Sequence, residues 1–334
     1  MHRIQQSEVF VQIMTSLTTN IQSAAELLRA GRLVAFPTET VYGLGADATN
    51  PIAVARIFEA KQRPTFDPLI VHVADISQVD QVVREFPETA RLLAAEFWPG
   101  PLTLVLPKRD CIPDLVTAGL PGVGIRIPRH SVALELLKAA GCPIAAPSAN
   151  PFGGISPTTA QHVADGLSGK VDCIVDGGPC AVGLESTVLS LMNDRPLLLR
   201  HGGCPVEHIE RLIGPVEIAT SDASQDDAAQ PAPGMLSRHY APGTRLIVIP
   251  HNQTAEPIAG LRCGLLTAGK CRFSGQFARI DTLCDDENLQ TCAANFFAAM
   301  RSLDSSDLDV IIAHEFPAHG LGVALNDRLR RAAH

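Results

Sequence analysis

Two basic side chains, Lys61 and Arg63, are the first candidates for chemistry, because they follow a helical stretch and directly precede Pro64. Cations at the C-terminal end of a helix commonly complement its dipole, which gives them a structural alternative. Pro64 ends the helix and is expected to leave both cations on a loop, where a polyphosphate can reach them. The pair indicates a phosphate site or a helix cap.

A loop with hydroxyl side chains and two glycines, Pro37–Gly45 (PTETVYGLG), follows the apolar strand expected at Arg32–Phe36. Glycines let a backbone approach a ligand closely, and binding residues concentrate on such loops. An ordinary tight turn explains the composition equally well.

Two apolar strands each carry one basic residue on the opposite face. In Leu69–Val73 the alternation of side chains separates His72 from the apolar residues, and Val123–Ile127 does the same for Arg126. A buried arginine needs an anionic partner, because burying it unpaired is costly. That partner is either a carboxylate of the protein or a carboxylate of a ligand.

More polar groups follow later strands, in the segments 145–150, 153–159, 183–187 and 199–203. Ser156 is also predicted to cap a helix that begins near Thr159. The serine in 183–187 lacks the G-x-S-x-G pattern, so a hydrolase triad is not expected. The sequence also contains no phosphate-binding loop of the Walker type, no dinucleotide-binding glycine motif and no His/Cys metal spacing. Any bound phosphate must therefore contact scattered lysine, arginine and hydroxyl groups.

Composition narrows the class of protein. The nine cysteines form no C-x-x-C pair, so neither a zinc site nor a disulfide framework is expected. A net charge of -8 argues against a broad nonspecific nucleic-acid surface. No apolar run is long enough to cross a bilayer, and the N-terminus does not resemble a signal peptide, so a cytoplasmic location is expected. Residues 1–14 are expected to be a short extension.

The elements that must position these residues are expected to form two domains, because 334 residues exceed the usual size of one. Strands outnumber helices in the first part, which favours a mixed sheet over a pure βαβ series. Ala219–Gly234 is small, polar and acidic and is predicted to be a linker. A small α/β domain is expected after it, from the strands 245–249, 264–267 and 310–313 and the helices 287–302 and 321–332. The apolar residues of the helix 287–302 fall on one face, which is expected to pack in the core: Leu289, Ala293, Phe296, Phe297 and Met300.

The ordered motifs FPTETVYGLG, KxRP, PLIVHV, WPGPLTLVL, GIRIP, APSAN, SPTTA, ESTV and SRHYAP together resemble the threonylcarbamoyl-AMP synthase family in its long two-domain form. The resemblance implies an α/β fold, a YrdC-like twisted mixed sheet with flanking helices plus a small Rossmann-like α/β domain. The implied divisions are a catalytic domain 17–214, a linker 215–243 that folds over the active site, and a C-terminal domain 244–334.

The family joins L-threonine, bicarbonate and ATP to give threonylcarbamoyl-AMP and pyrophosphate, for the threonylcarbamoyladenosine modification of tRNA next to the anticodon. By resemblance, L-threonine is held by Thr38, His72, Arg126, Ala146 and Ser186. ATP is held by Lys61, Thr65, Gly122, Ser148, Asn150, Ser156, Arg200 and Tyr240. Lys61 and Arg63 are expected to stabilise charge, and His72 is a candidate general base, although no residue is assigned with certainty to catalysis.

The implied cofactor is Mg²⁺ with ATP, with no metal bound tightly by the protein itself. The implied partners are downstream threonylcarbamoyl-transferase proteins that act on tRNA. Direct tRNA binding stays open, and no membrane association is expected.

Three departures from the family pattern occur, at Gln62 (usually glycine), at Phe66-Asp67 (usually Asp-Asn), and at Gly122 (often threonine). Two other functions remain as alternatives. A carbamoyl-AMP-forming maturation factor shares the catalytic fold but normally has an acylphosphatase-like domain and zinc-finger cysteines, which this sequence lacks. A non-catalytic RNA-binding module is disfavoured by the acidic net charge.

Overall fold

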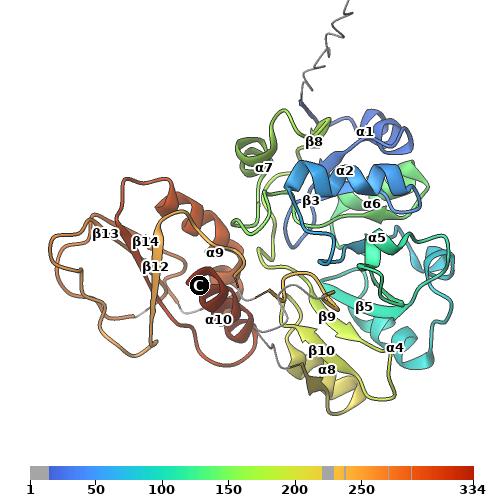
Figure 1. Cartoon of the computed structure of the whole chain (residues 1–334). Helices are drawn as coiled ribbons and strands as arrows, with labels where there is room; N and C mark the ends of the chain where they lie inside the picture. The colour runs from blue at the N-terminus through green and yellow to red at the C-terminus, as the bar shows by residue number, and fades with distance from the viewer. Residues whose placement is uncertain (1–14, 220–228, 237, 270, 287) are drawn as a thin grey trace, which may run out of the picture.

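Two sheets of unequal size organise the chain, an eleven-stranded sheet and a four-stranded sheet (Figure 1). The computed structural model describes residues 15–219, 229–236, 238–269, 271–286 and 288–334. The expected N-terminal extension, residues 1–14, lies outside the described residues, as do positions 220–228 of the expected linker. The large sheet belongs to the first part of the chain and the small sheet to the part after the linker.

The large sheet mixes parallel and antiparallel neighbours in the order β1-β8-β2-β3-β7-β4-β6-β5-β9-β10-β11. Its strands are β1 Ser16–Thr18, β2 Val34–Phe36, β3 Gly43–Asp47, β4 Ile70–His72, β5 Leu102–Pro107, β6 Gly122–Arg126, β7 Ile144–Ala145, β8 Cys173–Val175, β9 Thr187–Ser190, β10 Leu197–Arg200 and β11 Glu217–Ile218. The central strands β4 and β6 are parallel to each other, whereas β7 and β5 run antiparallel on either side. The expected mixed sheet is therefore confirmed.

Helices cover both faces of this sheet. They are α1 Ile21–Arg29, α2 Pro51–Lys61, the 3-10 turn η1 Ile76–Gln78, α3 Val79–Val82, α4 Glu88–Phe97, α5 Asp114–Thr117, α6 Ser131–Ala140, α7 Ala160–Leu167 and α8 Val206–Ile213. The side chains of Asn20 and Asn50 cap α1 and α2 by accepting hydrogen bonds from the first backbone amides. Residues of α1 and α6 pack against Val34 and Phe36 on one face of β2. Residues of α2 and α4 pack against the other face of the same strand.

The small sheet is entirely parallel, in the order β12-β15-β13-β14. Its strands are β12 Arg245–Ile249, β13 Cys263–Thr267, β14 Arg279–Thr282 and β15 Val310–His314. Its helices are α9 Leu289–Asp304 and α10 Leu321–Ala332, which lie on the side of the small domain that faces the large one (Figure 1). Ala293, Phe296, Phe297 and Met300 of α9 are fully buried, so the apolar stripe read from the sequence is confirmed as core.

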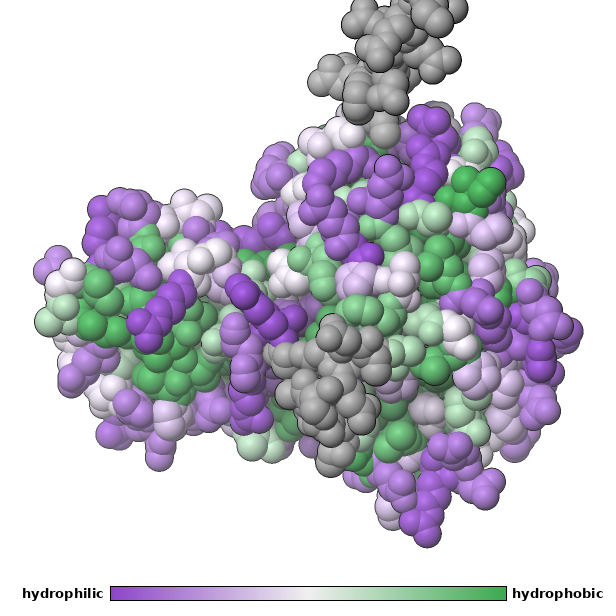
Figure 2. All heavy atoms as spheres, in the orientation of Figure 1, coloured by the Kyte–Doolittle hydropathy of each residue, from purple (hydrophilic) through white to green (hydrophobic). Residues whose placement is uncertain are grey.

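The other face of the small sheet is covered by loops that carry several exposed apolar side chains. Ala255 and Phe277 are buried against the strands, whereas Ile258, Leu261 and Phe273 are exposed. Figure 2 shows hydrophobic surface on this lobe of the molecule.

One hydrophobic cluster crosses from the large domain into the small one. Val41, Ile155 and Leu184 of the large domain and Tyr240 of the linker join the core formed by α9 and α10. Because this cluster is continuous, the two domains pack through apolar side chains and not only through the chain that links them.

Three details differ from the sequence-based expectations. Gly43 to Gly45 belong to β3 and not to a loop, because they pair with β2. The short strands β1 and β14 were not expected, since neither shows a clear alternation of apolar residues. Cys284 and Cys292 form a disulfide, although no cysteine pairing was expected.

Candidate active site

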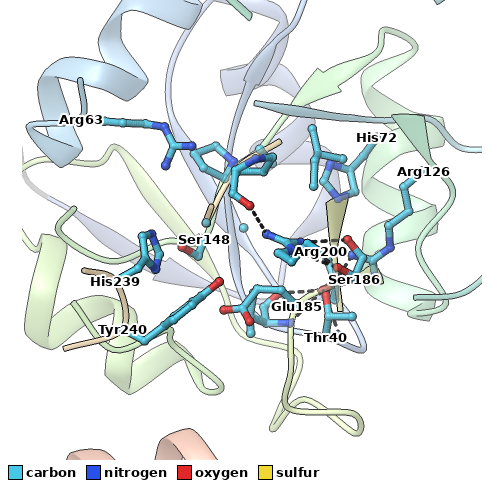
Figure 3. A pocket seen from close by; sticks show the side chains of 18 residues that line it. Thr40, Arg63, His72, Arg126, Ser148, Glu185, Ser186, Arg200, His239 and Tyr240 are labelled. Carbon is cyan, nitrogen blue, oxygen red and sulfur yellow. Dashed lines mark hydrogen bonds between the residues drawn. The ribbon is translucent and has the colours of Figure 1, made fainter. Parts of the chain in front are cut away.

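A pocket lies where the central strands of the large sheet meet four loops and the linker (Figure 3). Its cavity has a volume of about 50 Å³. The lining residues are Thr38, Thr40, Val41, Gly43, Arg63, Ile70, His72, Arg126, Ala146, Pro147, Ser148, Glu185, Ser186, Arg200, Pro233, Gly234, His239 and Tyr240. They come from segments up to about 200 positions apart in the chain, so only the folded chain creates this site.

His72 and Arg126 form one wall of the pocket. They are directly opposite each other in the register between β4 and β6, and both side chains are almost fully buried. Burial first, and then the nearby charge of Arg126, lowers the pKa of His72 from 6.5 to about 3. His72 is therefore a neutral imidazole at physiological pH, and its Nδ1 has no hydrogen-bond partner among the described residues.

Arg126 has a carboxylate partner within the protein. Its Nη2 lies 2.7 Å from Oε1 of Glu39, its Nη1 donates to Thr40, and its Nε donates to the carbonyl of Gly100. Nε and Nη1 each donate one hydrogen bond, whereas Nη2 is ion-paired with Glu39 but has no hydrogen-bond acceptor among the described residues, so its two N–H groups stay available. The buried partner of Arg126 is thus a carboxylate of the protein, the first of the two alternatives. Arg126 also keeps donors free for a second anion.

The loop before β3 is held by its own hydroxyl groups. The hydroxyl of Thr38 donates to the carbonyl of Val41 over 2.7 Å and also contacts the hydroxyl of Thr40. These short-range bonds fold the loop so that Glu39 can reach Arg126. The hydroxyls flagged in the sequence therefore shape the loop as well as line the pocket.

Lys61 is the last residue of α2, and not a loop residue as expected. The following Gln62 ends the helix in the left-handed conformation, with a φ of 54°. Nζ of Lys61 donates to the carbonyls of Ser148 and Asn150. Burial, and then the charge of Arg63, holds the pKa of Lys61 well below its usual value. The Gln62 position is one that glycine adopts without strain, which explains the glycine usual in the family.

Arg63 lies beside the pocket and is paired within the protein. Its Nη2 is 2.9 Å from Oδ2 of Asp67, and both side chains are buried. Two backbone carbonyls, those of Asp67 and Pro68, accept further hydrogen bonds from it. The Phe66-Asp67 departure from the family pattern therefore supplies the carboxylate that neutralises Arg63.

Arg200, at the end of β10, connects the sheet to the linker. Its Nε and Nη2 donate to the carbonyl of Ser186, and its Nη1 donates to the carbonyl of Pro233 over 2.8 Å. Gly234 follows with a φ of 78°, and a Cβ there would lie only 2.5 Å from the hydroxyl of Tyr240. The linker can pass this close to Tyr240 only because the residue is glycine.

His239 and Tyr240 face His72 and Arg126 across the pocket, with Arg200 between the two pairs (Figure 3). Burial, followed by the charges of Arg63 and Lys61, holds the pKa of His239 well below its usual value. Burial raises the pKa of Tyr240 to about 12, so its hydroxyl keeps its proton. The pocket thus contains several guanidinium groups together with two neutral imidazoles.

Glu185 links the pocket to the small domain. Its carboxylate accepts a hydrogen bond from the hydroxyl of Ser156 and contacts Arg328 of α10. The expected capping role of Ser156 is wrong, because Thr159 caps α7 by accepting from the amide of His162. The hydroxyl of Ser156 instead donates to the carboxylate of Glu185, 29 positions later in the chain.

All five residues expected to hold L-threonine line this pocket: Thr38, His72, Arg126, Ala146 and Ser186. Arg63 and three of the residues expected to hold ATP also line it: Ser148, Arg200 and Tyr240. Five others do not: Lys61, Thr65, Gly122, Asn150 and Ser156.

The five residues outside the lining lie at different distances from it. Lys61 and Ser156 contact lining residues directly, and Asn150 accepts from Lys61. Thr65 is exposed, and Gly122 begins β6 at the end away from Arg126. A Cβ at Gly122 would lie on the same face of β6 as Arg126, but only 2.9 Å from the side chain of Val105 and 3.0 Å from that of Met192, so these side chains already fill the position.

Sequence reasoning missed several functional neighbours of the site, chiefly Glu39, Glu185, His239 and Arg328. The first three lie inside motifs that were recognised, so their proximity to assigned residues was an available signal. Arg328 had no such signal, because an arginine near the end of an amphipathic helix usually lies on its exposed face.

No group of three or more His, Cys, Asp or Glu side chains in the described parts of the chain could hold a metal ion. No helix of those parts is long and apolar enough to cross a membrane.

Comparison with known proteins places this chain in a family. Residues 26–202 match a family model described as telomere recombination, which covers Sua5, YciO and YrdC proteins. Residues 204–334 match the model of the C-terminal domain of threonylcarbamoyl-AMP synthase.

Curated relatives match over nearly their full length. The chain is 45% identical to the threonylcarbamoyl-AMP synthase of Pyrococcus abyssi, over 94% of this chain and 94% of the relative. It is 46% identical to that of Bacillus subtilis, over 97% of this chain and 96% of the relative.

A solved structure resembles the whole molecule. The crystal structure of P. abyssi Sua5 complexed with L-threonine superposes with a TM-score of 0.85 at 42% identity. The match covers 96% of this chain and 97% of that chain, so the similarity in fold extends over both domains.

Proposed function

Because this chain belongs to the threonylcarbamoyl-AMP synthase family, we propose that this pocket is the place where it carries out the family's reaction. The chain is an enzyme of the nucleotidyltransferase type, which makes threonylcarbamoyl-AMP and pyrophosphate from L-threonine, bicarbonate and ATP. The observation that carries the proposal is the meeting of His72, Arg126, Arg200 and Tyr240 in one pocket.

L-Threonine is assigned to the wall of β4 and β6, with Thr38, His72, Arg126, Ala146 and Ser186. The two free N–H groups of Arg126 suit a carboxylate, which accepts two parallel hydrogen bonds from a guanidinium group. The neutral imidazole of His72 lines the same wall. The similarity to a Sua5 structure that contains L-threonine supports this assignment.

ATP is assigned to the opposite side, formed by Arg63, Ser148, Arg200 and Tyr240. Lys61, Asn150 and Ser156 support this side from just behind the lining, and Thr65 and Gly122 keep the ATP role that the resemblance implies. The cavity of about 50 Å³ is much smaller than a nucleotide, so the linker segment with Gly234 and Tyr240 must move for ATP to enter.

The reaction requires no nucleophile from the protein. The amine of L-threonine and bicarbonate give a carbamate and water. An oxygen of this carbamate then forms a bond to the α-phosphorus of ATP, the bond between the α-phosphorus and its bridging oxygen breaks, and pyrophosphate leaves. Arg63, Arg200 and Lys61 orient the phosphates and stabilise their charge. The closed linker excludes water from the carbamate and the mixed anhydride.

The metal ion, the cellular location, the partners and the domain boundaries belong to the same proposal. Mg²⁺ enters with ATP, since phosphate oxygens are the ligands that it prefers. The enzyme works in the cytoplasm, and its product is taken up by threonylcarbamoyl-transferase proteins that act on tRNA. We assign residues 17–214 to catalysis, residues 215–243 to the linker over the site and residues 244–334 to the C-terminal domain.

The test is an assay of the purified chain with ATP, Mg²⁺, bicarbonate and single amino acids. We expect pyrophosphate release that requires both L-threonine and bicarbonate, together with threonylcarbamoyl-AMP identified by mass spectrometry. Release that proceeds equally without L-threonine, or a carbamoyl-AMP product without an amino acid, would contradict the proposal.

A further inference from the structure

Arg328 of α10 is the most deeply buried arginine among the described residues, with a relative exposure of 0%. It belongs to the small domain, yet its side chain reaches the large one. Its Nε donates to Oε2 of Glu185 over 3.1 Å, and its Nη1 donates to the carbonyl of His201 over 2.6 Å. A charge this deeply buried must be paired; Oδ2 of Asp327 on the same helix lies 3.0 Å from its Nη1, and its other partners lie across the domain boundary.

Glu185 transmits this contact to the pocket. Its carboxylate lies between Arg328 and the hydroxyl of Ser156, and the residue itself lines the cavity. The carbonyl of the next residue, Ser186, holds the guanidinium of Arg200 through two hydrogen bonds. A displacement of Arg328 would therefore shift Glu185, and with it the residues assigned to ATP.

Tyr240 is the second point of contact. The guanidinium carbon of Arg328 lies 5.2 Å from the centre of the Tyr240 ring, within the range of a cation–π interaction. The same ring packs 5.7 Å from Phe297 of α9. Three residues further along α10, Arg331 donates to the carbonyls of Met235 and Leu236. The linker segment over the pocket is thus held by α10.

The loop that carries Glu185 also touches α9 directly. Gly183 has a φ of 73°, and a Cβ there would lie 2.4 Å from the carbonyl oxygen of Ala293. Leu184 is fully buried in the cluster that joins the two domains. The loop therefore contacts the small domain at one end and the pocket at the other.

We propose that Arg328 is a positioning residue that couples docking of the small domain to the ATP side of the pocket. Through Glu185 and Tyr240 it holds the loop and the linker in the closed arrangement. The assignment of that side to ATP rests on the proposed function, whereas the coupling between α10 and the linker does not depend on it.

The experiment compares Arg328→Met with Arg330→Met in the full chain. Arg330 lies on the same helix but is exposed and pairs with Glu315, so it is a matched control. For Arg328→Met we expect the KM for ATP to rise at least about 10-fold while the KM for L-threonine changes less than about 3-fold. Arg330→Met should leave both values unchanged.

Hydrogen exchange gives a readout that does not need activity. The amide of His239 donates to the carbonyl of Arg331, and the amide of Ala241 donates to the carbonyl of Gly153. In Arg328→Met these two amides should exchange at least about 10-fold faster, whereas those of β4 and β6 should stay protected. If Arg328→Met is unstable, Arg328→Lys keeps the charge but not the planar fork, and it should shift both readouts in the same direction.

Two results would overturn the inference. One is an Arg328→Met variant that matches Arg330→Met in both readouts. The other is faster exchange throughout the large sheet with equal rises in both KM values, which would mean that Arg328 only stabilises the fold. A wild-type chain that releases no pyrophosphate would refute the proposed function, while the exchange rates would still decide the coupling.

Discussion

Two buried histidines, His72 and His314, end parallel strands in the two sheets but differ in how their ring nitrogens are used. Nδ1 of His314 contacts the hydroxyl of Thr267 at 3.2 Å, and its Nε2 contacts the carbonyl of Gln253 at 3.1 Å. Nδ1 of His72, in contrast, has no hydrogen-bond partner among the described residues. A buried polar group costs free energy unless it is satisfied, so a satisfied histidine indicates structure and an unsatisfied one indicates a ligand.

The same contrast extends to the arginines of the two sheets. Arg126 is buried beside His72 and keeps two free N–H groups, whereas Arg279 on β14 is partly exposed and pairs with Asp281. The large sheet thus contains buried polar groups that have no hydrogen-bond partner among the described residues. The two residues compared in the small sheet, His314 and Arg279, are satisfied within the chain, and the small domain contacts the site through α9 and α10.

The largest effect is expected from Arg126→Met, combined with Glu39→Gln so that no carboxylate is left buried without its partner. Removing a buried charge that pairs with a ligand carboxylate costs about 4 kcal/mol, or roughly 10³-fold in affinity. We therefore expect calorimetry to show L-threonine binding reduced by about this factor and ATP binding changed much less.

Arg279→Met is the matched control in the small sheet and should bind both ligands as the wild type does. The division of the pocket into two sides is wrong if ATP and L-threonine affinities fall together in the Arg126 variant.

A reciprocal pair of substitutions tests the two histidines directly. His72→Gln should lower kcat/KM for L-threonine by on the order of 10²-fold with little change in stability, because it removes a contact to the substrate. His314→Gln should leave kcat/KM within about 2-fold but reduce the free energy of unfolding by about 1–3 kcal/mol, because it breaks a satisfied network. Steady-state kinetics and urea denaturation measure the two quantities.

The comparison of the two histidines would fail if His314→Gln lost activity while keeping its stability, or if His72→Gln only destabilised the fold.

The low pKa of His72 predicts a pH dependence of stability. In the unfolded chain its pKa is about 6.5, whereas in the fold it is about 3. Below pH 6.5 the unfolded state binds a proton that the folded state does not, so stability falls as the pH drops towards 3. One histidine contributes about 1.4 kcal/mol per pH unit, or about 2 kcal/mol between pH 6.5 and 5.

Urea denaturation of the wild type and His72→Gln at several pH values isolates this contribution. The slope of stability against pH should be smaller in the variant by about one bound proton. Identical slopes would mean that unfolding does not change the protonation of His72.

The smallest effect is expected at Gln62, whose φ of 54° is unfavourable for any residue with a Cβ. Gln62→Gly should raise the free energy of unfolding by about 0.5–1 kcal/mol, since glycine relieves the strain but loses more chain entropy. Ala118→Gly is a matched control, because Ala118 ends α5 with a φ of 53° away from the pocket.

Only the Gln62 variant should also alter the KM for ATP, through Lys61 and Arg63 on either side of it. If the two glycine variants have the same KM for ATP, the end of α2 at Gln62 does not influence ATP binding.

Local features of the chain were predictable because a few neighbouring residues determine them. Alternation of side chains placed His72 and Arg126 opposite the apolar residues of their strands, as the structure confirms. The 3.6-residue period of the long helix identified its buried face, and Leu321–Ala332 was predicted with its observed bounds. The order of the polar motifs was enough to recognise the family.

The tertiary structure decided which of these groups meet. No local pattern specifies the register that sets His72 beside Arg126, the use of Glu39 as its partner, or the reach of Ser156 to Glu185. Arg328 contacts Glu185 across 143 positions of the chain, and this contact exists only because the apolar surfaces of the two domains pack together. Local hydrogen bonding and periodicity act over a few residues, whereas such long-range contacts depend on the sum of many surfaces, which no single segment encodes.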